Sequence, residues 1–305
     1  MKIVFMGTPD FAVASLDALK NAGFDIAAVV TAADKPAGRG QKLSESAVKK
    51  YAVEHGLKVL QPLKLKDPDF INELEQLKAD LQVVVAFRML PEVVWNMPPK
   101  GTINLHGSLL PQYRGAAPIN HAIINGETET GVTTFFLKHE IDTGDVILSA
   151  KTAITDEDTA GTLHDKLMHI GADLIVKTVK AIDENTYTEV PQPMNAELKA
   201  APKIFKDFCD INWNQDLQTV YNHIRGLSPY PTAFTSLNGK NLKVFKVEKD
   251  FTIPTQTAGT YETDGKTFLK FATNNGYIKL LELQLEGKKR MMVDEFLRGV
   301  RLVDS

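Results

Sequence analysis

Two polar residues of the chain are spaced for joint chemistry. Asn104 and His106 are two positions apart, so on a β-strand both side chains leave the same face. The apolar run Leu81–Ala86 precedes them and is typical of a strand buried on both faces. An amide donor can hold a developing oxyanion while an imidazole handles a proton. The pair therefore suits acyl transfer.

A carboxylate from a distant turn completes this set. Asp142 lies in the segment Ile141–Asp145, where it can orient and charge-stabilise the imidazole of His106. The alternative is structural, because a lone histidine at a strand end usually makes a structural hydrogen bond and Asp-Thr-Gly-Asp is an ordinary turn. The following segment, Tyr113–Pro118, adds a cation and small residues, as a ligand-lined loop would. It favours the catalytic interpretation.

These motifs resemble a known family. Asn-x-His-Gly-Ser-Leu-Leu-Pro-x-Tyr-Arg-Gly from Asn104, followed by the Asp-Thr-Gly-Asp turn, is similar to the folate-dependent formyltransferase superfamily. Those enzymes move a formyl group from 10-formyltetrahydrofolate to an amine. Two further segments, Gly7–Phe11 and Asp34–Leu43, resemble the methionyl-tRNA formyltransferases within it. The resemblance implies an enzyme that formylates the α-amino group of charged initiator methionyl-tRNA for translation initiation.

The resemblance also implies a folate site without a metal. The family binds tetrahydrofolate with the segment matching Ser108, Leu109, Leu110 and Pro111, whose backbone and apolar side chains suit a flat pterin. The usual Ala-Tyr-Gly-x-Ile-Leu-Pro before it is here Ala86–Pro91, one residue shorter and with Arg88 inserted. This departure affects the shape of the pterin pocket. The single cysteine, Cys209, and the scattered histidines offer no ligand spacing for zinc.

The basic segment Asp34–Leu43 is expected to be neither helix nor strand. Without a resemblance it would be a solvated loop. In the resembling enzymes it enters the acceptor end of the tRNA, which implies contacts from Lys35, Arg39 and Lys42. Arg39 is the strongest candidate because guanidinium makes forked contacts. Phe11 either lies near the methionyl group or packs in the core.

Composition and charge indicate where the protein acts and what kind of partner it can bind. The 305 residues carry a formal charge of −3, yet residues 199–305 hold 16 Lys and Arg against 12 Asp and Glu, or +4, which leaves −7 elsewhere. This asymmetry permits a basic C-terminal surface that faces a polyanion. No apolar run is long enough to span a bilayer, and the start runs straight into a strand pattern. We expect a cytoplasmic protein with no membrane contact and no obligate protein partner.

Strands alternating with helices in the N-terminal part predict an α/β fold. We expect a Rossmann-like formyltransferase domain over residues 1–187, a linker over 188–203 and a smaller OB-like β-barrel domain over 204–305 that binds tRNA. The linker is marked by Pro191-Gln192-Pro193, and a hairpin by Asn238-Gly239. Ligands are expected at the carboxyl ends of the parallel strands.

Two alternative functions remain open at this point. A sister formyltransferase that acts on an amino-sugar nucleotide shares the Asn104–Pro111 motif but would lack the Gly7–Phe11 and Pro36–Gly40 segments. A non-catalytic RNA-binding protein would not need the three residues Asn104, His106 and Asp142 together. A nicotinamide oxidoreductase is disfavoured because Gly7-Thr8-Pro9-Asp10 lacks the glycines of a dinucleotide fingerprint.

Overall fold

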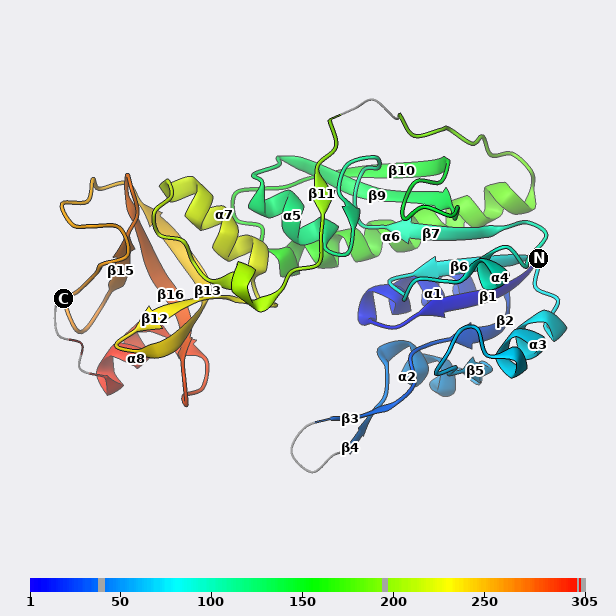
Figure 1. Cartoon of the computed structure of the whole chain (residues 1–305), viewed down its shortest axis with the longest axis horizontal. Coiled ribbons are helices and arrows are strands. Elements are labelled where there is room, and N and C mark those ends of the chain that lie inside the picture. The colour runs from blue at the N-terminus through cyan, green and yellow to red at the C-terminus, as the bar shows by residue number, and fades with distance from the viewer. Residues whose placement is uncertain (38–41, 194–196, 301, 303–305) are drawn as a thin grey trace. The chain divides into compact units, whose positions relative to one another are not determined.

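The computed structural model describes residues 1–37, 42–193, 197–300 and 302, which pack into two compact units (Figure 1). The first unit comprises Met1–Gly115, Thr130–Thr152 and His164–Ala200. The second comprises Ala116–Glu129, Ala153–Leu163 and Ala201–Ser305. Each unit thus takes several separate stretches of the chain. The boundaries at residues 187 and 204 stay a prediction.

A seven-stranded sheet forms the centre of the first unit. Its order is β10-β9-β7-β6-β1-β2-β5, and β9 runs antiparallel to β7 beside an otherwise parallel set that holds β5, β2, β1, β6 and β7. The strands are β1 (Lys2–Gly7), β2 (Asp25–Val30), β5 (Val59–Leu60), β6 (Leu81–Val85), β7 (Thr102–His106), β9 (Glu129–Phe136) and β10 (Val146–Ala153). Parallel strands joined by helices are the predicted Rossmann-like arrangement, which is confirmed.

Helices alternate with these strands along the chain. They are α1 (Asp10–Asn21), α2 (Ala47–Glu54), α3 (Pro68–Gln76), α4 (Glu92–Trp95) and α6 (Ala160–Asp183). The Ser46 hydroxyl accepts a hydrogen bond from the Lys49 amide, and Asp67 caps α3 with Pro68 at its first position. These side chains satisfy amides that a helix leaves unpaired. Short α4 was not predicted, because four residues carry too little periodicity.

The core of this unit lies between strands and helices. All five residues of β6 are buried, as expected for a strand covered on both faces. Phe70 and Leu74 of α3 and Val94 of α4 pack with apolar side chains of the sheet. Burial of this kind fixes the strand register, because a one-residue slip would turn the apolar set to the other face. The rigid strands then present their carboxyl ends as a fixed edge.

The expectation that Asp34–Leu43 contains no strand is wrong. Strand β3 (Lys35–Ala37) pairs antiparallel with β4 (Lys42–Ser44), with Lys35 opposite Ser44. The pairing joins backbone groups of the segment's own two arms, and the side chains of Lys35, Leu43 and Ser44 are exposed. Hydrophobic alternation, on which the expectation rested, therefore gives no signal for it. Residues 38–41, including Arg39, lie outside the described part of the chain.

The second unit is built on a curled antiparallel sheet of order β12-β13-β16-β15-β14, with β17 paired to β16. Register shifts in β13 between Val244 and Val247 bend that long strand. The strands are β12 (Ala233–Leu237), β13 (Lys240–Asp250), β14 (Tyr261–Thr263), β15 (Leu269–Ala272), β16 (Tyr277–Leu285) and β17 (Met291–Met292). The sheet forms a half-barrel, and the predicted smaller OB-like domain is confirmed.

The predicted hairpin at Asn238-Gly239 is also confirmed. Both residues have positive φ, 50° and 75°, and Leu237 pairs with Lys240. This is the geometry that favours Asn-Gly in two-residue turns. The remaining elements are β8 (Arg114–Gly115), which pairs with β11 (Ala200–Ala201), and η1 (Lys206–Cys209), α5 (Pro118–Ile124), α7 (Leu217–Leu227) and α8 (Val293–Gly299). Among the described residues, no helix has the length and apolar character required to cross a membrane.

Helix α7 offers a test of its cap. The Asp216 carboxylate accepts hydrogen bonds from the Thr219 hydroxyl (2.6 Å) and amide (3.0 Å), and these bonds lower the pKa of Asp216 from its ordinary 3.8. Asp216→Ala should reduce the unfolding free energy by about 1 kcal/mol at pH 7. A lowered folded-state pKa stabilises the fold above the unfolded pKa, so the difference should shrink as pH falls below about 4. Urea unfolding followed by Trp213 fluorescence measures both. Asp216→Asn, which retains an acceptor, should lose less stability.

Candidate active site

Strand β7 carries Asn104 and His106 to the edge where ligands are expected. Asn104 lies opposite Val84 of β6 and Phe135 of β9, and His106 is the last residue of the strand. Their spacing within one strand places both side chains on the same face, as predicted. The site is thus anchored on a strand between two hydrogen-bonded neighbours, which limits its movement.

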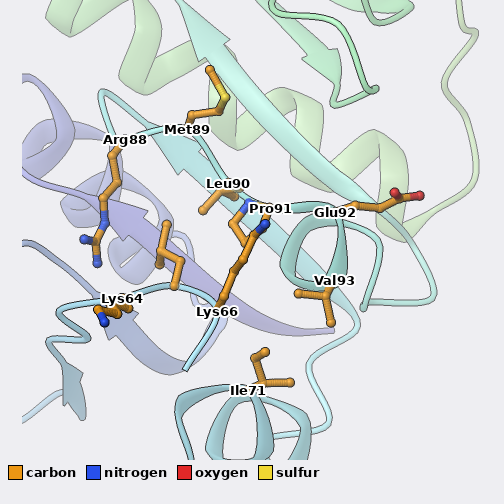
Figure 2. A pocket seen from close by; sticks show the side chains of 10 residues that line it. Lys64, Lys66, Ile71, Arg88, Met89, Leu90, Pro91, Glu92 and Val93 are labelled. Atoms are coloured by element: carbon orange, nitrogen blue, oxygen red, sulfur yellow. The ribbon is translucent and has the colours of Figure 1, made fainter. Parts of the chain in front are cut away.

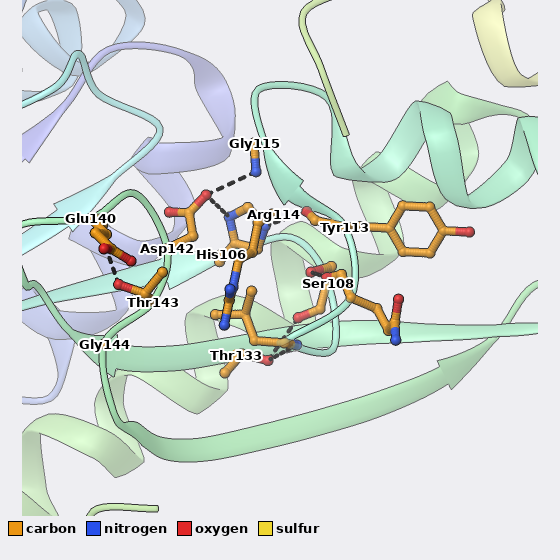
Figure 3. A network of polar contacts seen from close by, with 12 residues as sticks. His106, Ser108, Tyr113, Arg114, Gly115, Thr133, Glu140, Asp142, Thr143 and Gly144 are labelled. Carbon is orange, nitrogen blue, oxygen red and sulfur yellow. Dashed lines mark hydrogen bonds and ion pairs between the residues drawn. The ribbon is translucent and has the colours of Figure 1, made fainter. Parts of the chain in front are cut away.

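The imidazole of His106 is buried and held from two sides (Figure 3). Its Nε2 lies 2.9 Å from the backbone carbonyl of Tyr113. A carbonyl only accepts, so Nε2 must carry a hydrogen. In the neutral ring the lone pair is therefore on Nδ1, which faces the Asp142 carboxylate with 3.8 Å between Nδ1 and Oδ2. That separation is too long for a hydrogen bond.

Asp142 comes from the connection between β9 and β10. The residue is 9% exposed, and its Oδ2 accepts a hydrogen bond of 2.9 Å from the Gly115 amide. The same oxygen is the one nearest to His106. Asp142 has a φ of 56°, a left-handed conformation that aspartate tolerates better than most residues. The predicted meeting of Asp142 with His106 is therefore present, and Figure 3 shows both against Gly115.

Gly144 explains the composition of this turn. A Cβ built on it would lie 1.6 Å from the carbonyl oxygen of Phe136, so the two backbone segments touch where a side chain would stand. The Phe136 amide donates to the Asp145 carbonyl at 3.2 Å across the same turn. The close approach determines how tightly the chain returns after Asp142. It thereby limits where the carboxylate can lie.

The Asn104 side chain is half-buried, and its amide makes no hydrogen bond within the described part of the chain. A polar group beside a buried imidazole and without an internal partner is available to a ligand. An amide N–H there can donate to an oxygen on which negative charge develops. Of the three predicted catalytic residues, the structure thus joins His106 to Asp142 and presents Asn104 from the same strand face.

The turn after β7 is held by its own hydrogen bonds. Ser108 is fully buried, and its hydroxyl donates to the Gln112 carbonyl at 2.6 Å. The Thr133 hydroxyl donates to the Ser108 carbonyl at 2.7 Å and accepts from the Leu110 amide at 3.2 Å. The Ser108 hydroxyl is therefore already engaged. The half-buried side chains of Leu109, Leu110 and Pro111 remain as the apolar surface of the predicted folate segment.

The residues predicted to contact tRNA or the methionyl group lie in different surroundings. Phe11 is 7% exposed, and its ring lies edge-on to that of His164 with 5.3 Å between centroids. Lys35 is exposed on β3, while Lys42 begins β4. Arg39 lies outside the described residues. The roles assigned to these four residues stay predictions.

Three residues of the site were missed by the sequence reasoning. Tyr113 supplies the carbonyl to His106, Thr133 pins the turn after β7, and Gln192 hydrogen-bonds the turn that carries Asp142. Tyr113 acts through its backbone, which any residue has, so its type carries no signal. Gln192 was interpreted as linker because it stands between two prolines. The burial of Gln192 becomes apparent only when the segments that surround it in the fold are known.

A separate open cavity of about 1030 Å³ lies in the first unit beside the segment that departs from the family pattern (Figure 2). The Arg88 guanidinium donates to the carbonyls of Leu63 (3.0 Å) and Pro62. Burial lowers the pKa of Arg88. The inserted arginine therefore ties the β6–α4 connection to the segment after β5. The cavity is lined by Lys64, Leu65, Lys66, Ile71, Arg88, Met89, Leu90, Pro91, Glu92 and Val93.

The sequence offers no ligand spacing for zinc, and the structure can be compared with that prediction. Within the described ranges, no three His, Cys, Asp or Glu side chains gather as a metal site would require. Cys209 is buried, which raises the pKa of its thiol, and its sulfur lies 3.5 Å from the Phe205 carbonyl. It has the character of a small core residue. That the activity needs no metal stays a prediction.

Comparison with known proteins identifies relatives over the whole length. The pattern of the formyl transferase family matches residues 1–179, and that of the formyl transferase C-terminal domain matches residues 203–301. A methionyl-tRNA formyltransferase of Bacteroides fragilis is 55% identical over 313 residues, covering 100% of this chain and 97% of the relative. One of Flavobacterium johnsoniae is 50% identical and covers 100% and 98%.

Solved structures of lower identity share the fold. An N-formyltransferase from Helicobacter canadensis, in complex with folinic acid and dTDP-3-aminofucose, superposes with a TM-score of 0.69 at 22% identity, covering 95% of this chain and 100% of that one. HypX from Aquifex aeolicus, in complex with tetrahydrofolic acid, gives 0.65 at 19% identity and covers 98% and 48%.

The tight turn after Asp142 can be tested through Gly144. In Gly144→Ala the added methyl group would overlap the Phe136 carbonyl, so the turn must open. We expect a loss of about 1–3 kcal/mol in unfolding free energy, the usual range for overpacking. The control is Gly299→Ala in α8, where no described atom beyond its chain neighbours and its own helix backbone lies within 4 Å of the new Cβ, and the change should stay within about 0.5 kcal/mol. Equal denaturant midpoints for both variants would contradict the assigned contact.

Proposed function

Because the chain belongs to the formyl transferase family, we propose that it transfers the formyl group of 10-formyltetrahydrofolate to the α-amino group of methionyl-initiator tRNA. The observation that carries this proposal is the 50–55% identity, over the full chain, to relatives named methionyl-tRNA formyltransferase. The arrangement of Asn104, His106 and Asp142 supports a formyl transfer chemically. The product, formylmethionyl-tRNA, would serve translation initiation in the cytoplasm.

In the proposed reaction, the neutral amine of the methionyl group attacks the formyl carbon. A C–N bond forms, and the formyl oxygen takes negative charge. The Asn104 amide, which has no hydrogen-bond partner among the described residues, would donate a hydrogen bond to that oxygen. An amide fixed on a strand needs little rearrangement as the charge develops, so it stabilises the transition state more than the substrate.

His106 would move the proton. Its Nδ1 carries the lone pair in the neutral ring, since Nε2–H is directed to the Tyr113 carbonyl. Nδ1 accepts the proton of the attacking amine, and the adjacent Asp142 carboxylate stabilises the resulting imidazolium. The proton then passes to N10 of the folate as the C–N10 bond breaks, which releases tetrahydrofolate.

The folate cosubstrate fits the surroundings of these residues. The turn Ser108–Pro111 follows His106 directly and presents half-buried apolar side chains on a pinned backbone, which suits a flat ring. The solved relatives from H. canadensis and A. aeolicus were crystallised with folate-type compounds, which supports the assignment at the level of compound class. The pinned turn rather than the Ser108 hydroxyl would make the contacts.

One assay distinguishes the proposed function from its alternatives. The protein is incubated with 10-formyltetrahydrofolate and either charged initiator tRNA or an amino-sugar nucleotide, and formylated product is measured. Formylmethionine with the tRNA alone supports the proposal. Product with the sugar nucleotide alone would support the sister activity, and absence of both products with retained tRNA binding would support a binding protein.

The proposed catalytic residues predict large losses of rate. His106→Ala should lower formylation by roughly 10²–10⁴-fold, the range for a positioned acid–base group. Asn104→Ala should lower it about 10²–10³-fold, as for one oxyanion donor. The matched control is His169→Ala, because this histidine is exposed on α6 and has no role in the proposed reaction. Near-normal turnover by folded His106→Ala enzyme would refute the assignment.

The two basic regions predict different responses to salt. Phosphate contacts weaken with salt and carry no sequence information, whereas contacts at the acceptor end can discriminate between tRNAs. Replacing the exposed Lys243 and Lys246 of β13 with alanine should raise KM for tRNA and flatten its salt dependence. Arg39→Ala should instead reduce the preference for initiator over elongator methionyl-tRNA at an unchanged salt slope.

A salt series with both charged tRNAs measures these effects for each variant. Point variants are preferable to truncation near Pro193, because residues 116–129 and 153–163 belong to the second unit and would lose their packing partners. Full discrimination by Arg39→Ala, with loss of discrimination in the lysine variant, would make the half-barrel rather than the loop the selective element.

A further inference from the structure

A buried glutamine from the predicted linker uses every hydrogen-bonding position of its amide. Gln192 is 8% exposed, and its Nε2 donates to the carbonyl oxygens of Asp142 (2.9 Å) and Gly144 (2.7 Å). Its Oε1 accepts from Nε (3.1 Å) and Nη2 (2.6 Å) of Arg114. A glutamine amide can make two bonds as donor and two as acceptor, so no capacity is left over.

Gln192 joins the two loops that provide the neighbours of the His106 imidazole. One is the turn that carries Asp142, whose carboxylate faces Nδ1. The other is the Tyr113–Gly115 segment, which provides the carbonyl for Nε2 and the amide for the Asp142 carboxylate. The glutamine therefore links the backbones from which both partners of the imidazole project.

The orientation of the amide follows from its partners. The two backbone carbonyls can only accept and the guanidinium can only donate, so a reversed amide would place like groups together on both sides. The arrangement thus requires a group that donates on one side and accepts on the other. Glutamate would keep the Arg114 contacts, but it would direct a negative charge at two carbonyl oxygens.

Attachment of the linker does not depend on this side chain. Two residues earlier, Val190 pairs with Val146 through two backbone hydrogen bonds of 2.9 Å. Further along, the Gln112 side chain accepts from the Lys199 amide at 2.9 Å and donates to the Glu197 carbonyl at 3.1 Å. The linker is therefore held on both sides of Gln192, which leaves the amide to act on the turn and the loop.

We propose that Gln192 is a positioning residue that holds Asp142 and the Tyr113–Gly115 loop in register around His106. It touches no reacting atom in the proposed formyl transfer, and its kinetic consequence rests on that proposed function. Misplacement of a catalytic group by about 1 Å can lower a rate about 100-fold. Displacement of Asp142 or of the Tyr113–Gly115 loop should therefore lower kcat more than it changes KM.

The test compares two substitutions that remove different halves of the contact. Gln192→Met matches the length of the side chain but makes none of the four bonds, and kcat should fall about 10²-fold with KM nearly unchanged. Gln192→Glu keeps the Arg114 half and loses the Asp142 half, so it should lower kcat to a similar extent. A normal kcat for Gln192→Glu would show that the bonds to the turn do not matter.

Two control variants separate positioning from stability and from linker attachment. Gln82→Met alters another buried glutamine of the first unit, whose side chain accepts from the Thr102 hydroxyl at 3.1 Å. It should lower the denaturant midpoint but not kcat. Gln112→Met removes two bonds to the linker but leaves Gln192 in place, so it should lower kcat less than Gln192→Met does. In a double-mutant cycle, Gln192→Met should add little to Asp142→Ala, because a residue acting through Asp142 has no further effect once that carboxylate is gone.

A measurement independent of catalysis completes the test. The Gly115 amide is bonded to the Asp142 carboxylate, so its hydrogen exchange should become about tenfold faster in Gln192→Met and stay unchanged in Gln82→Met. Wild-type protein that fails to formylate charged tRNA would refute the proposed function, while Gly115 exchange would still decide the role of Gln192. Unchanged Gly115 exchange in Gln192→Met, or full additivity in the cycle, would overturn the positioning role.

Discussion

The structure of the site depends on a buried carboxylate opposite a buried imidazole. Removing a charge from water is unfavourable unless hydrogen bonds or an opposite charge compensate for it. Asp142 meets the first condition, because Oδ2 accepts a hydrogen bond from the Gly115 amide, and the same oxygen lies 3.8 Å from Nδ1 of His106. The carboxylate keeps this hydrogen bond only while the loop that supplies the amide is in place. The loop is thus as necessary to the site as the side chains proposed to be catalytic.

Strand and loops contribute differently to this geometry. His106 and Asn104 derive their direction from β7, whose register is fixed by pairing with β6 and β9 and by burial of the core. The partners of His106 come from loops, which have no such register of their own. Gly144 and Gln192 supply what the loops lack: the close approach to Phe136 shapes the turn, and the amide joins it to Arg114.

The predicted linker has a structural role in the first unit as well as connecting two units. Its residues pair with the start of β10 at Val190 and reach the Asp142 turn through Gln192. The second unit in turn includes Ala116–Glu129 and Ala153–Leu163 from the N-terminal half of the chain. The two packed units thus do not correspond to the two halves of the sequence. A substitution in the N-terminal half of the chain can therefore change the packing of the second unit.

The sequence by itself determined the α/β class, the half-barrel hairpin at Asn238-Gly239 and the identity of Asn104, His106 and Asp142 as chemical groups. Those features depend on local periodicity, turn preferences and side-chain type, which a sequence displays directly. Only the tertiary structure decided which nitrogen of His106 faces Asp142. It also decided that the Ser108 hydroxyl donates to the Gln112 carbonyl and that Gln192 is buried. These features arise from backbone carbonyls, backbone amides and contacts between distant segments, and no residue pattern encodes them.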